Sequence, residues 1–114
     1  MYKVMLLIPP RVDLESFDAR WPEFLHLAEQ MPGLDRETTS LVQDNVYGKQ
    51  VFNRVYEFFF PDKASLIKGM TSPVGEEAGR LIHEMTNGQV TILVAEHKED
   101  QLSNLRPPSP DEPS

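Results

Sequence analysis

The run VFNRVYEFFF, residues 51–60, decides the fold, because it is the most strand-like stretch of the chain. It is rich in β-branched and aromatic residues, and Pro61-Asp62 ends it abruptly. Its polar residues, Asn53, Arg54 and Glu57, leave neither face of such a strand wholly apolar. We therefore expect a strand in the middle of a sheet, with helices on one face and another layer on the other.

Hydrophobic periodicity predicts the elements around this strand. Short runs rich in apolar and β-branched residues indicate strands, and apolar residues three and four positions apart indicate amphipathic helices. A turn at 47–50 predicts that the second and third strands pair as a hairpin. The predicted order is a strand at 2–8, a helix at 14–31 with a kink or restart at Pro22, a strand at 36–43, the strand at 51–60, a helix at 63–70, a second helical piece from Ser72-Pro73 to Asn87-Gly88, and a strand at 89–96.

This β-α-β-β-α-β order is that of the ferredoxin-like α+β fold, in which four antiparallel strands carry both helices on one face. The second face of such a sheet is open. Here the first, third and fourth strands have hydrophobic residues on both faces, so the open face is too apolar to remain in water. We therefore expect a homodimer joined sheet to sheet, and a monomer with a half-apolar face is the alternative.

Composition limits the classes of function. The 114 residues correspond to one domain, and a formal net charge of −7 argues against binding to nucleic acid or to an anionic membrane. The absence of cysteine excludes disulfides and thiolate metal sites. The apolar run at 4–9 is too short to span a bilayer. We expect a soluble, cytoplasmic protein with a domain at 1–97 and a proline-rich, acidic tail at 98–114.

Several features of the stretch 1–96 occur together: an opening strand followed by prolines, Phe17 and Trp21 ahead of Met31-Pro32-Gly33-Leu34, a strand through 56–60 that runs into an aspartate, the Ser72-Pro73 break and a final strand at 90–94. The most specific of them are the Pro-Gly-Leu step and the Ser-Pro helix restart. In these features the stretch resembles the EthD-like family of dimeric α/β-barrel proteins. The resemblance implies the same ferredoxin-like fold, a sheet-to-sheet homodimer, and an accessory role in degradation pathways.

One position departs from the family. The resemblance would place a histidine in the first helix at Phe24 or Leu25, and neither residue is histidine. His26 is close but out of register, so the family's histidine role does not transfer to it. On a helical wheel His26 points away from the apolar stripe, unless Pro22 turns the second half of the helix inward.

Two residues are candidates for acid–base chemistry, and four aromatic residues are candidates for ligand binding. Glu57, flanked by aromatic residues, could act as a general base in an apolar pocket, or it could pair with Arg54 or Arg80. His26 is the second weak candidate. The aromatic residues that could line a cavity between helix and sheet, or simply fill the core, are Trp21, Phe24, Tyr56 and Phe58.

The chain has no glycine-rich phosphate loop, nucleophile elbow or metal motif, so we expect no cofactor and no metal. The favoured hypothesis is a homodimer that binds an apolar or aromatic metabolite as an accessory of a degradation or secondary-metabolism pathway. The alternatives are a cofactor-independent oxygenase, lyase or isomerase that uses the helix–sheet cavity, and a structural dimer without a ligand. An unpaired Glu57 facing a cavity would favour the enzyme, and a paired Glu57 the binding protein.

Overall fold

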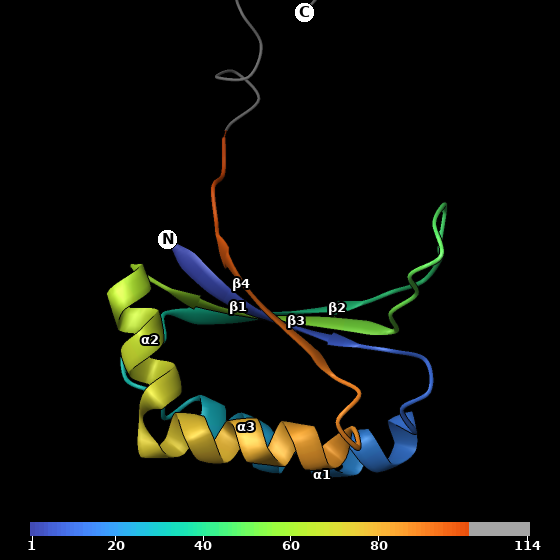
Figure 1. The fold of residues 1–114 in the computed structure, drawn as a ribbon, viewed down its shortest axis with the longest axis horizontal. Coiled ribbons are helices and arrows are strands. Elements are labelled where there is room, and N and C mark those ends of the chain that lie inside the picture. Colours follow the sequence, from blue (N-terminus) through green and yellow to red (C-terminus); the bar gives the residue numbers. More distant parts are fainter. Residues whose placement is uncertain (101–114) are drawn as a thin grey trace, which may run out of the picture.

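The computed structural model describes residues 1–100 of the chain. They form a four-stranded antiparallel sheet with the strand order β2-β3-β1-β4. In Figure 1 the helices at 14–28 and 73–85 lie along one side of the sheet, and the helix at 63–71 stands at one end of it. The predicted ferredoxin-like α+β fold is confirmed. In chain order the elements are β1 (Tyr2–Ile8), α1 (Leu14–Ala28), β2 (Arg36–Leu41), β3 (Arg54–Phe60), α2 (Lys63–Thr71), α3 (Pro73–Met85) and β4 (Thr91–Glu96).

The strand expected at the middle of the sheet is β3, which lies between β2 and β1. It begins at Arg54, three residues later than predicted, because the residues before Arg54 have few ladder partners. The last backbone bond of the β2–β3 pair joins the Val42 N–H to the Asn53 carbonyl at 2.9 Å. Beyond it, residues 43–52 form a long connection that projects from the sheet (Figure 1). The predicted antiparallel pairing of these two strands is confirmed.

Local capping explains where the helices begin. Asp13 accepts a hydrogen bond from the Glu15 N–H at the start of α1, and Asp62 accepts one from the Ser65 N–H at the start of α2. Ser72 ends α2 and caps α3, whose first residue is Pro73. The predicted Ser-Pro restart is therefore confirmed.

The first helix shows no restart, one of the two alternatives predicted at Pro22, and it ends earlier than predicted. It runs through Pro22 as one helix, with Phe17, Phe24 and Ala28 buried along one stripe. It ends at Ala28, before the expected Met31, and Gly33 then takes the left-handed backbone conformation (φ 83°) that reverses the chain toward β2.

The sheet has a helix-covered face and an open face. Alternate residues of the two central strands are buried under the helices: Val4, Leu6 and Ile8 on β1, and Tyr56, Phe58 and Phe60 on β3. On the edge strand β4, Ile92 and Val94 point to the same side but remain 43% and 50% exposed. The helical layer therefore covers the centre of the sheet and leaves the β4 edge accessible.

No helix within residues 1–100 is both long enough and apolar enough to cross a membrane. The predicted proline-rich tail lies outside the described residues, apart from its first positions, 98–100.

Candidate functional site

An aromatic cluster joins α1 to β3. The indole of Trp21 stacks on the phenol ring of Tyr56, with ring centroids 4.0 Å apart, and Phe17 packs against both rings. Phe24, one helical turn beyond Trp21, meets the ring of Phe58 edge-on at 6.0 Å. This arrangement follows from helical spacing on α1 and from the alternation of β3, which puts Tyr56 and Phe58 on one face. The structure thus brings the four predicted ligand-binding residues together.

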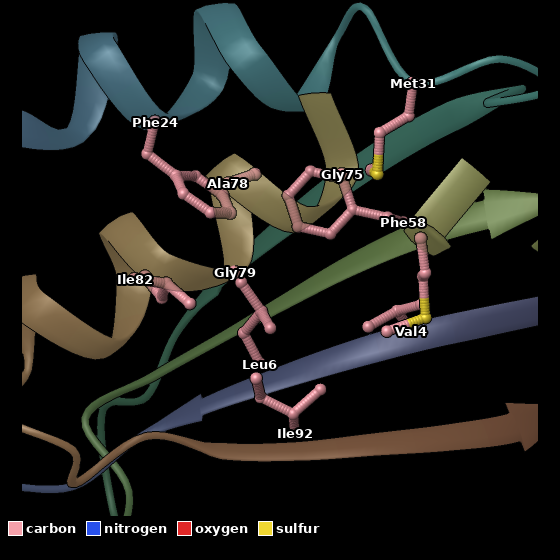
Figure 2. Close-up of a pocket in the computed structure, with 11 residues that line it drawn as sticks. Val4, Leu6, Phe24, Met31, Phe58, Gly75, Ala78, Gly79, Ile82 and Ile92 are labelled. Carbon is pink, nitrogen blue, oxygen red and sulfur yellow. The ribbon is translucent and has the colours of Figure 1, made fainter. Parts of the chain in front are cut away.

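A small apolar cavity lies beside this cluster, between α3 and the sheet (Figure 2). Its volume is about 50 Å³. Of the predicted ligand-binding residues, Phe24 and Phe58 line it, whereas Trp21 and Tyr56 lie in the adjacent stack. The complete lining is Val4, Leu6, Phe24, Met31, Phe58, Met70, Gly75, Ala78, Gly79, Ile82 and Ile92.

Two glycines of α3 shape this cavity in different ways. A Cβ at Gly75 would lie 2.2 Å from the Gly69 carbonyl oxygen, so Gly75 is required for α3 to approach the end of α2. A Cβ at Gly79 would meet no atom within 4 Å. Gly79 and Ile92 are both exposed, so the cavity opens to solvent between α3 and β4. The sequence analysis missed both glycines, although their four-residue spacing on one helix was a visible signal.

An ion pair fixes the other end of the aromatic cluster. Both guanidinium NH₂ groups of Arg54 donate to the Asp18 carboxylate on α1, and Nη1 also donates to the Tyr56 hydroxyl oxygen at 3.3 Å. The hydrogen bond from Arg54 lowers the pKa of Asp18, and burial raises the pKa of the Tyr56 phenol. The guanidinium group of Arg54 therefore bonds to Asp18 on α1 and to Tyr56 on its own strand.

Glu57 lies on the open face of the sheet, opposite the cavity. Its carboxylate is paired with the Lys3 ammonium and accepts a hydrogen bond from the Thr38 hydroxyl at 3.3 Å. The partner is Lys3 and not Arg54 or Arg80, because in the β1–β3 register Glu57 is opposite Met5, and Lys3 lies two residues from Met5 on the same face. Glu57 is therefore a paired carboxylate that does not reach the helix–sheet cavity.

His26 also lies away from the cavity. It is exposed on α1, and Pro22 does not turn it inward. Its backbone carbonyl accepts a hydrogen bond from the Gln30 side chain at 2.9 Å. Neither acid–base candidate from the sequence faces the space where the aromatic residues gather.

The open face is polar at one end and apolar at the other. At the polar end, Phe59 is buried beneath the guanidinium of Arg36, 4.0 Å from the ring centroid, and the edge-on ring of His97. Glu99 lies 2.7 Å from His97 Nε2 and 3.3 Å from Arg36, and the hydrogen bond with His97 lowers the pKa of Glu99. At the other end, Met5 and Leu7 are half-buried and Leu93 is 46% exposed.

Glu37 on β2 is a carboxylate that the sequence analysis did not select. Its neighbour Thr38 bonds to Glu57 on the open face, so Glu37 points to the helix side. Its Oε2 atom is buried and has no hydrogen-bond partner among residues 1–100. Burial raises the pKa of this carboxyl, and the nearby charge of Glu29 raises it further. A polar residue in an edge strand carries no signal of burial, which is why the sequence did not reveal it.

Comparison with known proteins agrees with this architecture. No protein-family model and no curated protein sequence matches the chain. Among solved structures, an EthD family protein from Bacillus halodurans C-125 matches with a TM-score of 0.77 and 21% identity, over 86% of this chain and 99% of that one. A dimeric ferredoxin-like protein of unknown function from Jannaschia sp. CCS1 gives a TM-score of 0.65 and 18% identity, over 84% and 98%.

The likeness is one of fold. A hydroxynitrile lyase from Passiflora edulis also matches, with a TM-score of 0.67 and 12% identity, over 88% of this chain and 95% of that one. The match to the EthD family protein shows that the resemblance noted in the sequence extends to the three-dimensional structure. The same architecture also carries enzymes, so the chemistry of this chain depends on its own residues.

Proposed function

We propose that the protein is a homodimer that binds a small apolar or aromatic molecule in the cavity between α3 and the sheet. The observation that carries this proposal is the cavity itself. Its lining is apolar, and the absence of a side chain at Gly79 keeps it open toward β4. Glycine has a low helix propensity, and core packing alone does not require a glycine at this exposed position of α3.

The cavity as it stands is smaller than an aromatic ligand needs, since an engineered cavity of about 150 Å³ is known to hold benzene. Two methionines, Met31 and Met70, belong to its lining. Methionine is unbranched and flexible, and it adapts readily to ligands of different shape. We expect these side chains to move aside when a ligand enters through the opening at Gly79 and Ile92.

Binding without turnover is favoured over catalysis by the placement of the acid–base candidates. Glu57 is paired with Lys3 on the opposite face, and His26 is exposed on α1. A cofactor-independent enzyme remains the second candidate, because the hydroxynitrile lyase from Passiflora edulis shares the fold. As a binding protein, the dimer would serve as an accessory of a degradation or secondary-metabolism pathway.

The homodimer is supported by the open face of the sheet. Its apolar part includes Met5, Leu7 and Leu93, which neighbour one another across β1 and β4. A second copy would cover these side chains through a two-fold, self-complementary interface. The solved ferredoxin-like protein from Jannaschia is described as dimeric, and this assembly is proposed for the present chain.

The binding proposal is tested with toluene as an apolar aromatic probe, followed by backbone amide NMR of the full chain. We expect shifts at Phe24, Phe58 and Gly79 that saturate with toluene concentration. Gly79→Leu, which places a side chain across the opening, should weaken binding at least tenfold, whereas Glu77→Leu on the solvent side of α3 should leave it unchanged. Equal binding by both variants, or no saturable shift, would reject the cavity as a ligand site.

A further inference from the structure

Residues 43–52, which join β2 to β3, form an arm with an apolar tip. Figure 1 shows the arm rising from the sheet on the side away from α1 and α3, which is the side of the open face. At its tip the Asn45 side chain donates a hydrogen bond to the Gly48 carbonyl oxygen at 2.9 Å, and Gly48 takes the positive φ (106°) that glycine accommodates. This closed turn holds Val46 and Tyr47 outward, where they are 94% and 95% exposed.

Exposed apolar side chains are concentrated on this arm and at its base. A single exposed apolar residue is ordinary on a protein surface, but a contiguous group marks an interaction site. A connection that only links two strands through water needs no more than polar turn residues. Of the ten large hydrophobic residues that are exposed within residues 1–100, five lie here: Leu41, Val42, Val46, Tyr47 and Val51.

The arm and the open face share a hollow of about 250 Å³. Val51 and Phe52 line it from the arm, and Val55 lines it from β3. Tyr56 is buried beneath the helices, so its neighbour Val55 points to the open face. In the β1–β3 register Val55 is opposite Leu7, which belongs to the apolar part of that face. The arm therefore continues the surface on which a second copy is proposed to pack.

The sheet alone offers little apolar area for such a contact. A stable interface covers roughly 800 Å² on each partner, and even a large aromatic side chain buries only about 150–250 Å². Met5, Leu7 and Leu93 are partly covered already, so they supply only a fraction of that area. The arm adds apolar surface without adding net charge, because Asp44 and Lys49 balance each other in a chain of net charge −7. Two copies of like charge can therefore approach along it.

We infer that the arm of each subunit clasps a second copy of the chain, with Val46 and Tyr47 as the anchoring side chains. Tyrosine is among the residue types that contribute most to binding at protein interfaces. In a two-fold dimer the two arms make the same contact twice, so each substitution at the tip acts at two places. This inference rests on the proposed homodimer and adds the segment that holds its subunits together.

The test is the dimer Kd of the full chain, measured by sedimentation velocity over a dilution series. The double variant Val46→Ser, Tyr47→Ser should raise this Kd about tenfold or more. Ile67→Ser on α2 is the matched control, because it also removes an exposed apolar side chain, and it should leave the Kd unchanged. Urea denaturation below the dimer Kd should give both variants the wild-type free energy of unfolding, since the replaced side chains are exposed in the monomer.

A single thiol reads the position of the arm directly, because the chain has no cysteine. The thiol of Val46→Cys should react with a maleimide several times more slowly above the dimer Kd than below it, since the second copy covers it. The thiol of Glu77→Cys, at an exposed position of α3, should react at one rate in both conditions.

The outcomes separate the arm from the dimer itself. A wild-type chain that stays monomeric at every concentration would overturn the homodimer and the inference together. A dimer that Leu93→Glu dissociates, but that the double variant leaves unchanged, would retain the homodimer and overturn the role of the arm. A thiol at position 46 that reacts equally fast above and below the Kd would also overturn it, because the arm would then lie outside the interface.

Discussion

The indole ring of Trp21 lies 4.0 Å, centroid to centroid, from the phenol ring of Tyr56, and the two planes are inclined by 22°. This stack has a shorter centroid separation than the other ring pairs between α1 and β3, Phe17–Tyr56 and Phe24–Phe58, which are each 6.0 Å apart. Trp21 is only partly buried, whereas Tyr56 is buried beneath it and bonded to Arg54. The contact therefore fixes the position of α1 over the sheet and, with it, one side of the cavity.

Replacing Trp21 tests how much this stack contributes to the free energy of unfolding. Trp21→Ala should lower the free energy of unfolding by about 2–4 kcal/mol, because it removes a large aromatic contact and exposes Tyr56. Trp21→Phe keeps a ring over Tyr56 and should cost about half as much. Urea denaturation followed by far-UV circular dichroism measures both values. Equal losses in the two variants would show that the stacked ring itself contributes little.

The two glycines of α3 should respond in opposite directions to the same substitution. Gly79→Ala should raise the free energy of unfolding by about 0.5–1 kcal/mol, since the new methyl group enters open space and alanine favours helix. Gly75→Ala should lower it by about 1–3 kcal/mol, because the added Cβ would meet backbone atoms of α2.

Thermal and urea denaturation of the two alanine variants make this comparison directly. Each variant serves as the control for the other, since both change helix propensity by the same amount. A loss of stability in Gly79→Ala would mean that the space beside α3 is already filled, and this would contradict the cavity.

The pH dependence of stability should carry a signature of Glu37. Its pKa is raised above the ordinary value of 4.5, so the native state binds this proton more tightly than the unfolded chain does. The contribution of Glu37 to the free energy of unfolding therefore falls as the pH rises from 4.5 through the raised value. Glu37→Gln should remove that fall.

The measurement is urea denaturation of wild type and Glu37→Gln at about pH 4 and about pH 7, taken as the difference between the two proteins. The variant should gain stability relative to wild type at the higher pH. Carboxylates with lowered pKa, such as Asp18, lose their contribution at more acid pH and cancel in this difference. A difference that does not change with pH would contradict a raised pKa for Glu37.

The proposed dimer should depend on the open face of the sheet. Leu93→Glu would place a charge among Met5 and Leu7, and we expect it to convert a dimer into a monomer of 13.0 kDa. Ile67→Glu on α2 is the matched control, because Ile67 is similarly exposed on the helical side. Size-exclusion chromatography with light scattering reads the mass of each. A dimer that survives Leu93→Glu but not Ile67→Glu would move the interface to the helices.

Much of the fold could be predicted because its signals are local. Asp13, Ser72 and Pro73 mark helix starts by their own chemistry, and the alternation of Tyr56 and Phe58 gives the buried face of β3. The start of β3 was misplaced because the β-propensity of Val51 does not reveal whether a partner strand is present.

The site was harder to predict, because it depends on contacts distant in sequence. The aromatic residues were found, since their helical and strand spacings are visible. The partner of Glu57 depends on the β1–β3 register that brings Lys3 beside it. The cavity depends on the absence of a side chain at Gly79, and the burial of the Glu37 Oε2 atom depends on how the chain packs around an edge strand. Neither feature follows from local composition.

Native mass spectrometry of freshly purified protein tests the central claim most directly, because it reports subunit number and any retained molecule together. The account predicts a dimer that carries additional small-molecule mass, and the loss of that mass, but not of the dimer, in Gly79→Leu. A bare monomer, or a retained molecule that Gly79→Leu does not displace, would contradict it.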